Sequence, residues 1–344
     1  MENILFLAHT ESDGSLSKAA LEALGAAVEL CSGQKNATLT VGLIGEQIDA
    51  ALTAAGGCGA ARCLAVCGED FGVSRYASDA AAAEALLGAC KASLVLAPAS
   101  SRFCRALPGL AQRVSGRIDT QVSALDSSSG ELRVQRWFYR QRMVATLSQS
   151  QRPWILLLSS GAFSPWQGGS PALKAEQISV ELPDTCKRTK VEGFQAPPAD
   201  AQTIRPDAKI LFVAGAGWTK KQAAPENDAK KAETLIRGFI SSAKASLGSS
   251  KSLVDLSAQG QEVLSFMSHL NQVGQTGSTP RHPKGLSTCC HGEEPHVVGW
   301  RFISERRAIN LDAGCGWAHG KADVLYVADA FEVMEKLNEL LAKG

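Results

Sequence analysis

The sequence lacks a surplus of charge of either sign, because its 35 lysines and arginines nearly cancel its 34 aspartates and glutamates and leave a formal charge of +1. Without a basic surplus there is no bulk electrostatic reason to expect nucleic acid as a partner. Long apolar runs are missing too: the run from Trp154 to Leu158 falls far short of the ~20 residues that a membrane-spanning helix needs. We therefore expect neither nucleic-acid binding nor membrane insertion.

Targeting and metal-binding signals are scarce as well. The apolar segment at residues 3–8 follows Met1 almost directly and has no basic flank, unlike a targeting segment, so we expect a cytoplasmic protein. The ten cysteines include no C-x-x-C pair, and the spacing of Cys58, Cys63 and Cys67 matches no zinc or cluster pattern. In a reducing compartment we expect most of them to be reduced, semi-buried small hydrophobic residues.

What the sequence does contain is an alternation of strand-like and helix-like segments. At ~150 residues per domain, 344 residues predict two domains, and a hydrophobic fraction of 45% suffices for ordinary buried cores. Up to about residue 125, short apolar runs alternate with alanine-rich amphipathic stretches. The expected strands are 4–8, 38–44, 63–66 and 94–97, and the expected helices are 17–31, 48–55 and 79–90. Such alternation predicts parallel strands joined by right-handed crossovers.

The pattern changes in the next segment. Short β-type runs at 132–134, 143–147 and 154–158 are separated by polar turns without helices, which predicts an antiparallel addition to the first sheet. The stretch Pro197-Pro198-Ala199-Asp200 is polar and rich in proline, as linkers between domains commonly are.

A second alternation follows the linker. Its expected elements are a strand at 209–214, a helix at 232–247, strands at 307–310 and 324–329, and a final helix at 330–342. The sequence thus predicts an α/β protein with two Rossmann-like, doubly wound parallel-sheet domains. The first covers residues 1–196, the linker 197–206, and the smaller second domain 207–344.

Two glycine-containing segments of the second domain are candidate ligand loops. Gly215-Ala216-Gly217 follows a strand, but it is only a fragment of a phosphate-binding pattern and is equally consistent with a plain tight turn. In Val273-Gly274-Gln275-Thr276-Gly277, two glycines bracket an amide and a hydroxyl. With free backbone N–H groups, such a loop could hold a pyrophosphate while Gln275 and Thr276 add directed hydrogen bonds. An ordinary polar loop is the alternative.

Several ordered motifs carry a family resemblance. Residues 272–277 read Q-V-G-Q-T-G, and residues 248–255 resemble G-A-S-R-A-A-V-D. Downstream, residues 308–310 read A-I-N, and 327–331 resemble V-A-D-L-F. Through these motifs the chain resembles the alpha subunit of electron transfer flavoprotein over nearly its full length, as a divergent member.

The resemblance implies a flavin adenine dinucleotide (FAD) held mostly by the second domain, with the first domain at a subunit interface. In the family, the Q-T pair lies along the flavin and the pyrophosphate, the S-R pair contacts the cofactor, and the residues matching Asn310 and Asp329 hold its adenosine half. The cofactor-binding residues implied here are Ser250, Lys251, Val273, Gly274, Gln275, Thr276, His291, Gly292, His296, Asn310 and Asp329. The resemblance implies no catalytic residue and no metal ligand.

The sequence departs from the family pattern in three places. Lys251 replaces the arginine of the S-R pair, which keeps the charge and loses the planar guanidinium. Ala214 to Trp218 stand where the family reads S-G-G-R-G, so a serine and an arginine are lost. Residues 291–296 read H-G-E-E-P-H in place of S-G-A-I-Q-H and keep the glycine and the final histidine, which in the family donates to the flavin's pyrimidine carbonyl.

The resemblance further implies an electron carrier and not a self-sufficient enzyme. The family works as an alpha–beta heterodimer that accepts electrons from flavoprotein dehydrogenases and passes them to a quinone oxidoreductase or a similar acceptor. Two alternatives stay open: a flavin-poor interaction subunit, and a redox subunit with a metal or an iron–sulfur cluster. The residues that motivate the second alternative are His282, Cys289, Cys290, His291, Glu293, Glu294, His296, Cys315 and His319.

Overall fold

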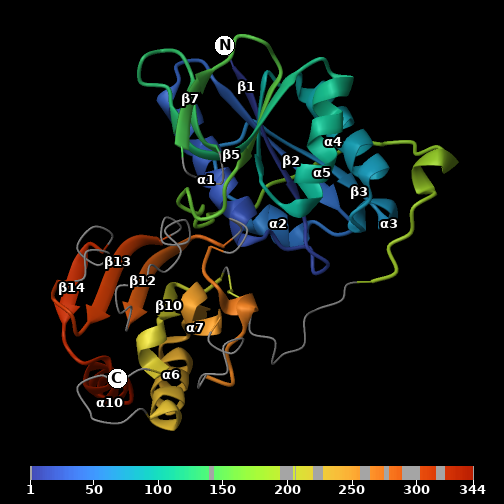
Figure 1. The fold of residues 1–344 in the computed structure, drawn as a ribbon. Coiled ribbons are helices and arrows are strands. Elements are labelled where there is room, and N and C mark those ends of the chain that lie inside the picture. Colours follow the sequence, from blue (N-terminus) through green and yellow to red (C-terminus); the bar gives the residue numbers. More distant parts are fainter. Residues whose placement is uncertain are drawn as a thin grey trace. The chain divides into compact units, whose positions relative to one another are not determined.

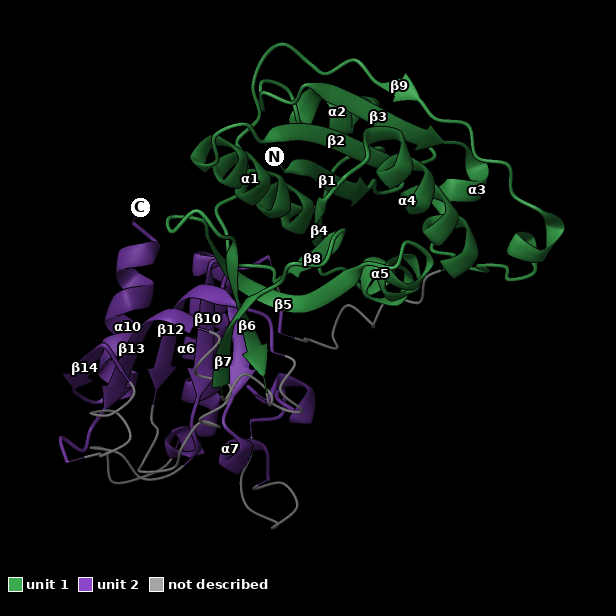
Figure 2. Ribbon diagram, turned by 90° about the horizontal axis from the view of Figure 1, so that it is seen from above, with its two compact units in different colours: residues 1–139, 143–194 green, residues 140–142, 195–344 purple. Residues whose placement is uncertain are grey.

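The computed structural model describes residues 2–138, 143–193, 204–205, 207–219, 228–255, 264–274, 279–288, 303–314 and 322–343. The chain divides into two compact units, one of residues 1–139 and 143–194 and one of residues 140–142 and 195–344 (Figure 2). Each unit is an α/β structure with its own sheet and its own core.

The first unit is built on a nine-stranded sheet, with strand order β7-β6-β5-β8-β4-β1-β2-β3-β9. Figure 1 labels β1, β2, β3, β5 and β7 of this sheet. Its parallel strands include β1 (Asn3–His9), β2 (Thr38–Gly45), β3 (Arg62–Cys67), β4 (Leu94–Pro98) and β8 (Trp154–Leu158). The remaining strands are β5 (Arg117–Asp126), β6 (Arg133–Phe138), β7 (Met143–Ser148) and the short β9 (Glu176–Gln177). Strands β6 and β7 are antiparallel, and β5 joins them to the parallel part of the sheet.

Helices cover both faces of this sheet. Buried residues of α1 (Lys18–Gly33) and α2 (Asp49–Ala54) form a core cluster on one face. Buried residues of α3 (Glu69–Gly72), α4 (Tyr76–Cys90) and α5 (Ser101–Arg113) form a second cluster on the other. A one-turn helix, η1 (Asp184–Lys187), lies near the end of the unit. Helices on both faces explain why β1 and β4 read as continuous apolar runs.

One strand differs from its predicted pairing. The sequence groups 154–158 with the antiparallel addition, but β8 is parallel to both β4 and β5 and lies between them. Its five residues are all buried, as in an interior strand covered on both faces. The sequence pattern also does not predict β5, because its ten residues are mostly polar and only Val122 is fully buried.

The second unit contains a five-stranded, all-parallel sheet, with order β11-β10-β12-β13-β14. The strands are β10 (Ile210–Ala214), β11 (Ser246–Ser249), β12 (His282–Thr288), β13 (Ile303–Asn310) and β14 (Val324–Val327). The helices are α6 (Ala229–Ala243), α7 (Lys251–Asp255) and α10 (Ala330–Leu341), with one-turn helices η2 (Ala216–Thr219) and η4 (His269–Asn271).

The helix predicted at 232–247 ends earlier than expected. Lys244 adopts a left-handed conformation (φ 49°) and caps α6, so residues 246–249 form β11 instead. Helices α6 and α10 pack side by side on one face of the sheet, where Asn338 Nδ2 donates to the carbonyl of Leu235 at 2.9 Å. No helix in the described ranges is long and apolar enough to span a bilayer.

Candidate functional site

The five strands of the second unit end together at one edge of their sheet. Ala214, the last residue of β10, pairs with Ser249 of β11 on one side and Thr288 of β12 on the other. Asn310 of β13 pairs with Val327 of β14 at the same edge. Strand order reverses between β10 and β12, the position where doubly wound sheets bind ligands beyond the carboxyl ends of their strands.

Ser250 and Lys251 lie at the end of β11. The Ser250 N–H donates to the carbonyl of Ala214 at 2.8 Å, and its hydroxyl accepts the N–H of Leu253 at 3.2 Å, which caps α7. The Lys251 side chain is about half exposed and forms an ion pair with Asp255 one turn along α7. The structure thus places the cation at the strand edge but already paired with a carboxylate.

The segment Gln272 to Gly274 lies directly against the end of β11. Gln272 forms a parallel bridge with Ser249, and the Val273 N–H donates to the Ser249 carbonyl at 3.0 Å. The Val273 side chain is fully buried, whereas Gly274 has φ +81° and donates its N–H to Thr279 Oγ1 at 2.6 Å. The expectation of free N–H groups is therefore wrong for Val273 and Gly274.

The remaining predicted residues of this loop, Gln275 and Thr276, lie outside the described residues, as do His291, Gly292 and His296. The structure nevertheless brings two sequence-distant motifs together, because residues 248–251 and 272–274 are joined by backbone contacts. Gly274, the last described residue of this segment, thus follows directly on the contact with the end of β11.

Asn310 and Asp329 occupy neighbouring strand ends but have different surroundings. Asn310 is 2% exposed; its Oδ1 accepts the N–H of Asp312, and its Nδ2 is buried with no hydrogen-bond partner among the described residues. Asp329 caps α10 by accepting the N–H groups of Phe331 and Glu332 at 2.8 and 3.4 Å. A buried amide donor without an acceptor is unusual in native proteins and suits a polar ligand atom.

Trp218 fills the turn after β10. Its side chain is fully buried, its Nε1–H donates to Thr288 Oγ1 at 2.8 Å, and its ring lies 4.8 Å from the Phe331 ring. The Gly215 N–H donates to the Thr288 carbonyl, so this turn is a buried one-turn helix and not an open phosphate loop. The sequence shows that Gly217 stands in place of the family arginine, but it gives no sign that the neighbouring Trp218 becomes part of the core.

His282 is unavailable to the metal site considered above. It is 1% exposed, and both of its ring nitrogens lie within 3 Å of backbone carbonyl oxygens. Cys289, Cys290, Glu293, Glu294, Cys315 and His319 lie outside the described residues. Among the residues that are described, no group of three histidine, cysteine or acidic side chains could hold a metal ion.

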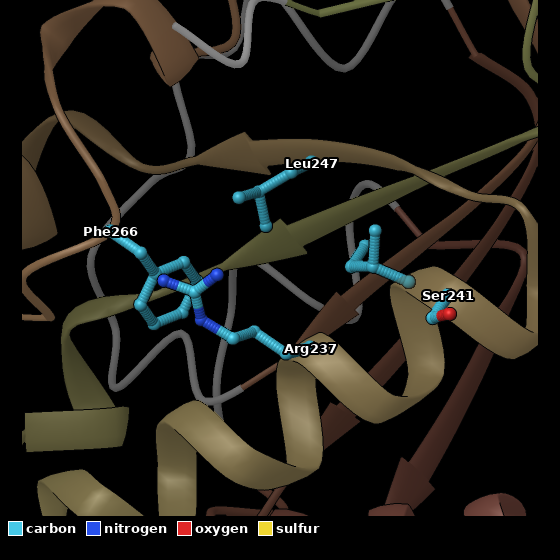
Figure 3. A pocket seen from close by; sticks show the side chains of 5 residues that line it. Arg237, Ser241, Leu247 and Phe266 are labelled. Atoms are coloured by element: carbon cyan, nitrogen blue, oxygen red, sulfur yellow. The ribbon is translucent and has the colours of Figure 1, made fainter. Parts of the chain in front are cut away.

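A cavity of about 330 Å³ lies against α6 and β11 (Figure 3). It is lined by Arg237, Ile240, Ser241, Leu247 and Phe266. The Arg237 guanidinium lies over the Phe266 ring at 4.7 Å and its Nε donates to Glu233 at 2.7 Å. Because the lining comes from the C-terminal half of α6, which runs back along the parallel sheet, the cavity is separate from the strand ends.

The first unit holds a buried polar cluster where β1 and β4 end. The Ser100 hydroxyl accepts the N–H of Phe103, which caps α5, and lies 3.0 Å from His9 Nε2. Next to it, Arg102 forms a buried ion pair with Asp79. Burial, together with the Arg102 charge, lowers the pKa of His9 to about 4, so the ring that contacts Ser100 is neutral at neutral pH.

His9 predicts a specific pH dependence of stability. Because its folded pKa lies below the ordinary value of 6.5, the neutral imidazole stabilises the first unit fully above pH 6.5, and this contribution is lost as pH falls towards 4. At ~1.4 kcal/mol per pKa unit, we expect a loss of about 3 kcal/mol across this interval. Urea unfolding at several pH values measures it. His9→Gln should flatten the profile; equal profiles for wild type and His9→Gln would contradict the assignment.

The structure describes seven of the cysteines and one arginine, Arg136, of the cluster in the first unit. The seven described cysteines are free thiols, and burial raises the pKa of Cys63 to about 12. Arg136 forms an ion pair with Asp119 at 2.8 Å and lies over the Phe138 ring at 4.4 Å. Arg140 and Arg142 lie outside the described residues.

Comparison with known proteins bears on the first unit. The family model described as "Electron transfer flavoprotein domain" matches residues 4–185, just over half of the chain. A search of curated proteins found no match. The matched range contains all nine strands of the first sheet, with their parallel order and the β5–β7 addition. The chain belongs to the electron transfer flavoprotein family.

Proposed function

We propose that this chain is the alpha subunit of a heterodimeric electron transfer flavoprotein, acting in the cytoplasm. On this proposal it carries electrons on FAD from flavoprotein dehydrogenases to a quinone oxidoreductase or a similar acceptor. The second unit would hold the cofactor, and the first unit would contact the beta subunit. Bound FAD would supply the reversible storage of electrons, while the protein sets its orientation and potential.

The observation that carries the proposal is the unsatisfied amide of Asn310. Its buried Nδ2 lies at the carboxyl edge of a parallel sheet, on β13, which neighbours β12 of the order reversal. The motifs at 248–251 and 272–274 reach the same edge from a different part of the sequence. A dinucleotide laid along this edge could accept from Asn310 at one end and contact the loop after Gly274 at the other.

Two exposed sheet edges support the proposal that another protein chain binds this one. Strand β7 is the last strand of the first sheet and exposes Met143 and Val144. Strand β14 is the last strand of the second sheet and exposes Val324, Tyr326 and Val327. Apolar side chains along an edge strand are typical of surfaces that another chain covers.

An absorbance spectrum of the heterodimer, purified from co-expression with a beta subunit, tests the proposal. Flavin bands near ~450 nm at one flavin per heterodimer would support it. A colourless heterodimer would favour the interaction-subunit alternative, and a broad charge-transfer absorption with bound iron would favour the cluster alternative.

Asn310 offers a sharper test, because removing an unsatisfied amide has opposite effects with and without a ligand. In the flavin-free protein, Asn310→Leu should leave stability unchanged or raise it, since it removes a buried donor that has no partner. In the flavin-bound protein it should weaken FAD retention about 5- to 30-fold, the effect of losing one buried hydrogen bond. Calorimetric melting of both forms and flavin titration measure the two effects; unchanged FAD affinity in Asn310→Leu would contradict the assignment.

A further inference from the structure

His282 has a hydrogen-bond arrangement that a neutral histidine cannot complete. It begins β12, at the edge of the second sheet opposite the strand ends, and is 1% exposed. Its Nδ1 lies 2.9 Å from the carbonyl oxygen of Pro280, and its Nε2 lies 2.8 Å from that of Arg205. A carbonyl oxygen only accepts, and a neutral imidazole carries one N–H, so only the doubly protonated ring donates to both.

The Arg205 carbonyl belongs to the segment that enters the second unit. The Arg205 N–H donates to Ser246 Oγ at 2.8 Å, and its Nη2 donates to the Lys244 carbonyl at 3.0 Å. The preceding Ile204 packs on a core cluster of the sheet. This entry segment, residues 204–205, is therefore held between the first residue of β11 and the first residue of β12, with His282 as the side-chain contact on the β12 side.

We propose that His282 is a protonation-sensitive latch that fixes the entry segment to the amino edge of the second sheet. With two protons the ring binds the Pro280 turn and the entry segment together. Loss of one proton leaves one carbonyl without a donor, and one of the two attachments breaks. Because the Pro280 carbonyl lies only two residues from His282 on the same turn, the neutral ring keeps that bond and releases Arg205, so the latch is closed at low pH and opens as pH rises.

The charged groups around the ring affect how readily His282 takes up its second proton. The elements packed near His282 carry more cations than carboxylates. The cations lie on β12 and directly before it, on the entry segment, at the start of β10 and directly after α6, and there are two carboxylates. These groups are Arg281, Lys284, Arg205, Lys209, Lys244, Asp207 and Glu305. The excess of cations disfavours the second proton, whereas the two carbonyl acceptors favour it. Burial of the ring also disfavours the second proton.

Nuclear magnetic resonance of the whole chain, labelled with ¹⁵N in histidine, tests the protonation state of the His282 ring. At ~pH 5.5, below the ordinary imidazole value of ~6.5, both His282 ring nitrogens should carry protons. His9 is the internal control, since its pKa of about 4 keeps one ring nitrogen bare at the same pH. A His282 ring with one bare nitrogen throughout the folded pH range would overturn the proposal.

Hydrogen exchange of the Arg205 amide tests whether loss of the second His282 proton releases the entry segment. Corrected for intrinsic exchange, its rate should rise about tenfold as the second His282 proton is lost, the effect of breaking one charged hydrogen bond. His282→Gln should remove this pH dependence. If that variant does not fold, Ser246→Ala should increase the pH dependence, because His282 then carries more of the attachment beside the Arg205–Lys244 hydrogen bond and the packing of Ile204. An Arg205 exchange rate with the same pH profile in wild type and variant would contradict the latch.

Discussion

Replacing Asp79 by asparagine is expected to lower the free energy of unfolding of the first unit by about 3–5 kcal/mol. Asp79 and Arg102 are almost completely buried, and the guanidinium donates to both carboxylate oxygens at 2.6–3.0 Å. The same guanidinium donates to the Phe71 carbonyl at 2.6 Å, so the pair joins α3, α4 and α5. Removing the carboxylate leaves a buried cation without its counter-charge. Urea unfolding of the first unit measures the loss.

The chain offers a matched control on the same two helices. Arg113 of α5 and Glu84 of α4 form an ion pair at 3.0 Å with both side chains more than a third exposed. Glu84→Gln should cost less than ~1 kcal/mol, because solvent screens an exposed pair. The double variant Asp79→Leu with Arg102→Met should recover much of the stability lost in Asp79→Asn, since no charge is left buried. A loss for Asp79→Asn no larger than for Glu84→Gln would contradict this account.

Trp218→Ala is expected to destabilise the second unit by about 3–5 kcal/mol, the usual cost of deleting a fully buried aromatic side chain. The indole packs in the core cluster formed by η2, α6 and α10, and its N–H is bonded to Thr288 at the end of β12. Hydrogen exchange of β10 and β12 peptides measures the effect on this unit separately from the first.

Two further variants separate packing from hydrogen bonding at this position. Trp218→Phe keeps most of the apolar volume and loses the N–H, so we expect a cost of about 1–2 kcal/mol. Trp218→Arg should cost at least as much as Trp218→Ala, because it places a charge in an apolar core. A Trp218→Arg protein as stable as wild type would show that this turn can open to admit a charged side chain.

The sequence alone was sufficient for most of the first unit. Alternating apolar and amphipathic segments predicted β1 to β4 and three of the helices close to their observed bounds, because period and composition are local properties. It also predicted a parallel sheet, which the alternation of strands and helices requires. Motif order alone led to the family whose domain matches residues 4–185.

The candidate site was predicted less completely. Sequence motifs selected Ser250, Val273 and Asn310, and the structure places all three at or beside one sheet edge. The missing acceptor of the Asn310 amide could not be read from a motif, since it depends on every neighbour of that side chain. The hydrogen bond from the Gly274 N–H to Thr279 could not be predicted from the sequence for the same reason.

Only the tertiary structure decided the direction and place of β8, because a short apolar run pairs equally well in either direction until its neighbours are fixed. It likewise decided that Trp218 is core and that His282 faces two carbonyls. The sequence determines which segments become helices and strands through local periodicity. Burial and hydrogen-bond partners arise from contacts between residues far apart in the chain, and no local pattern records them.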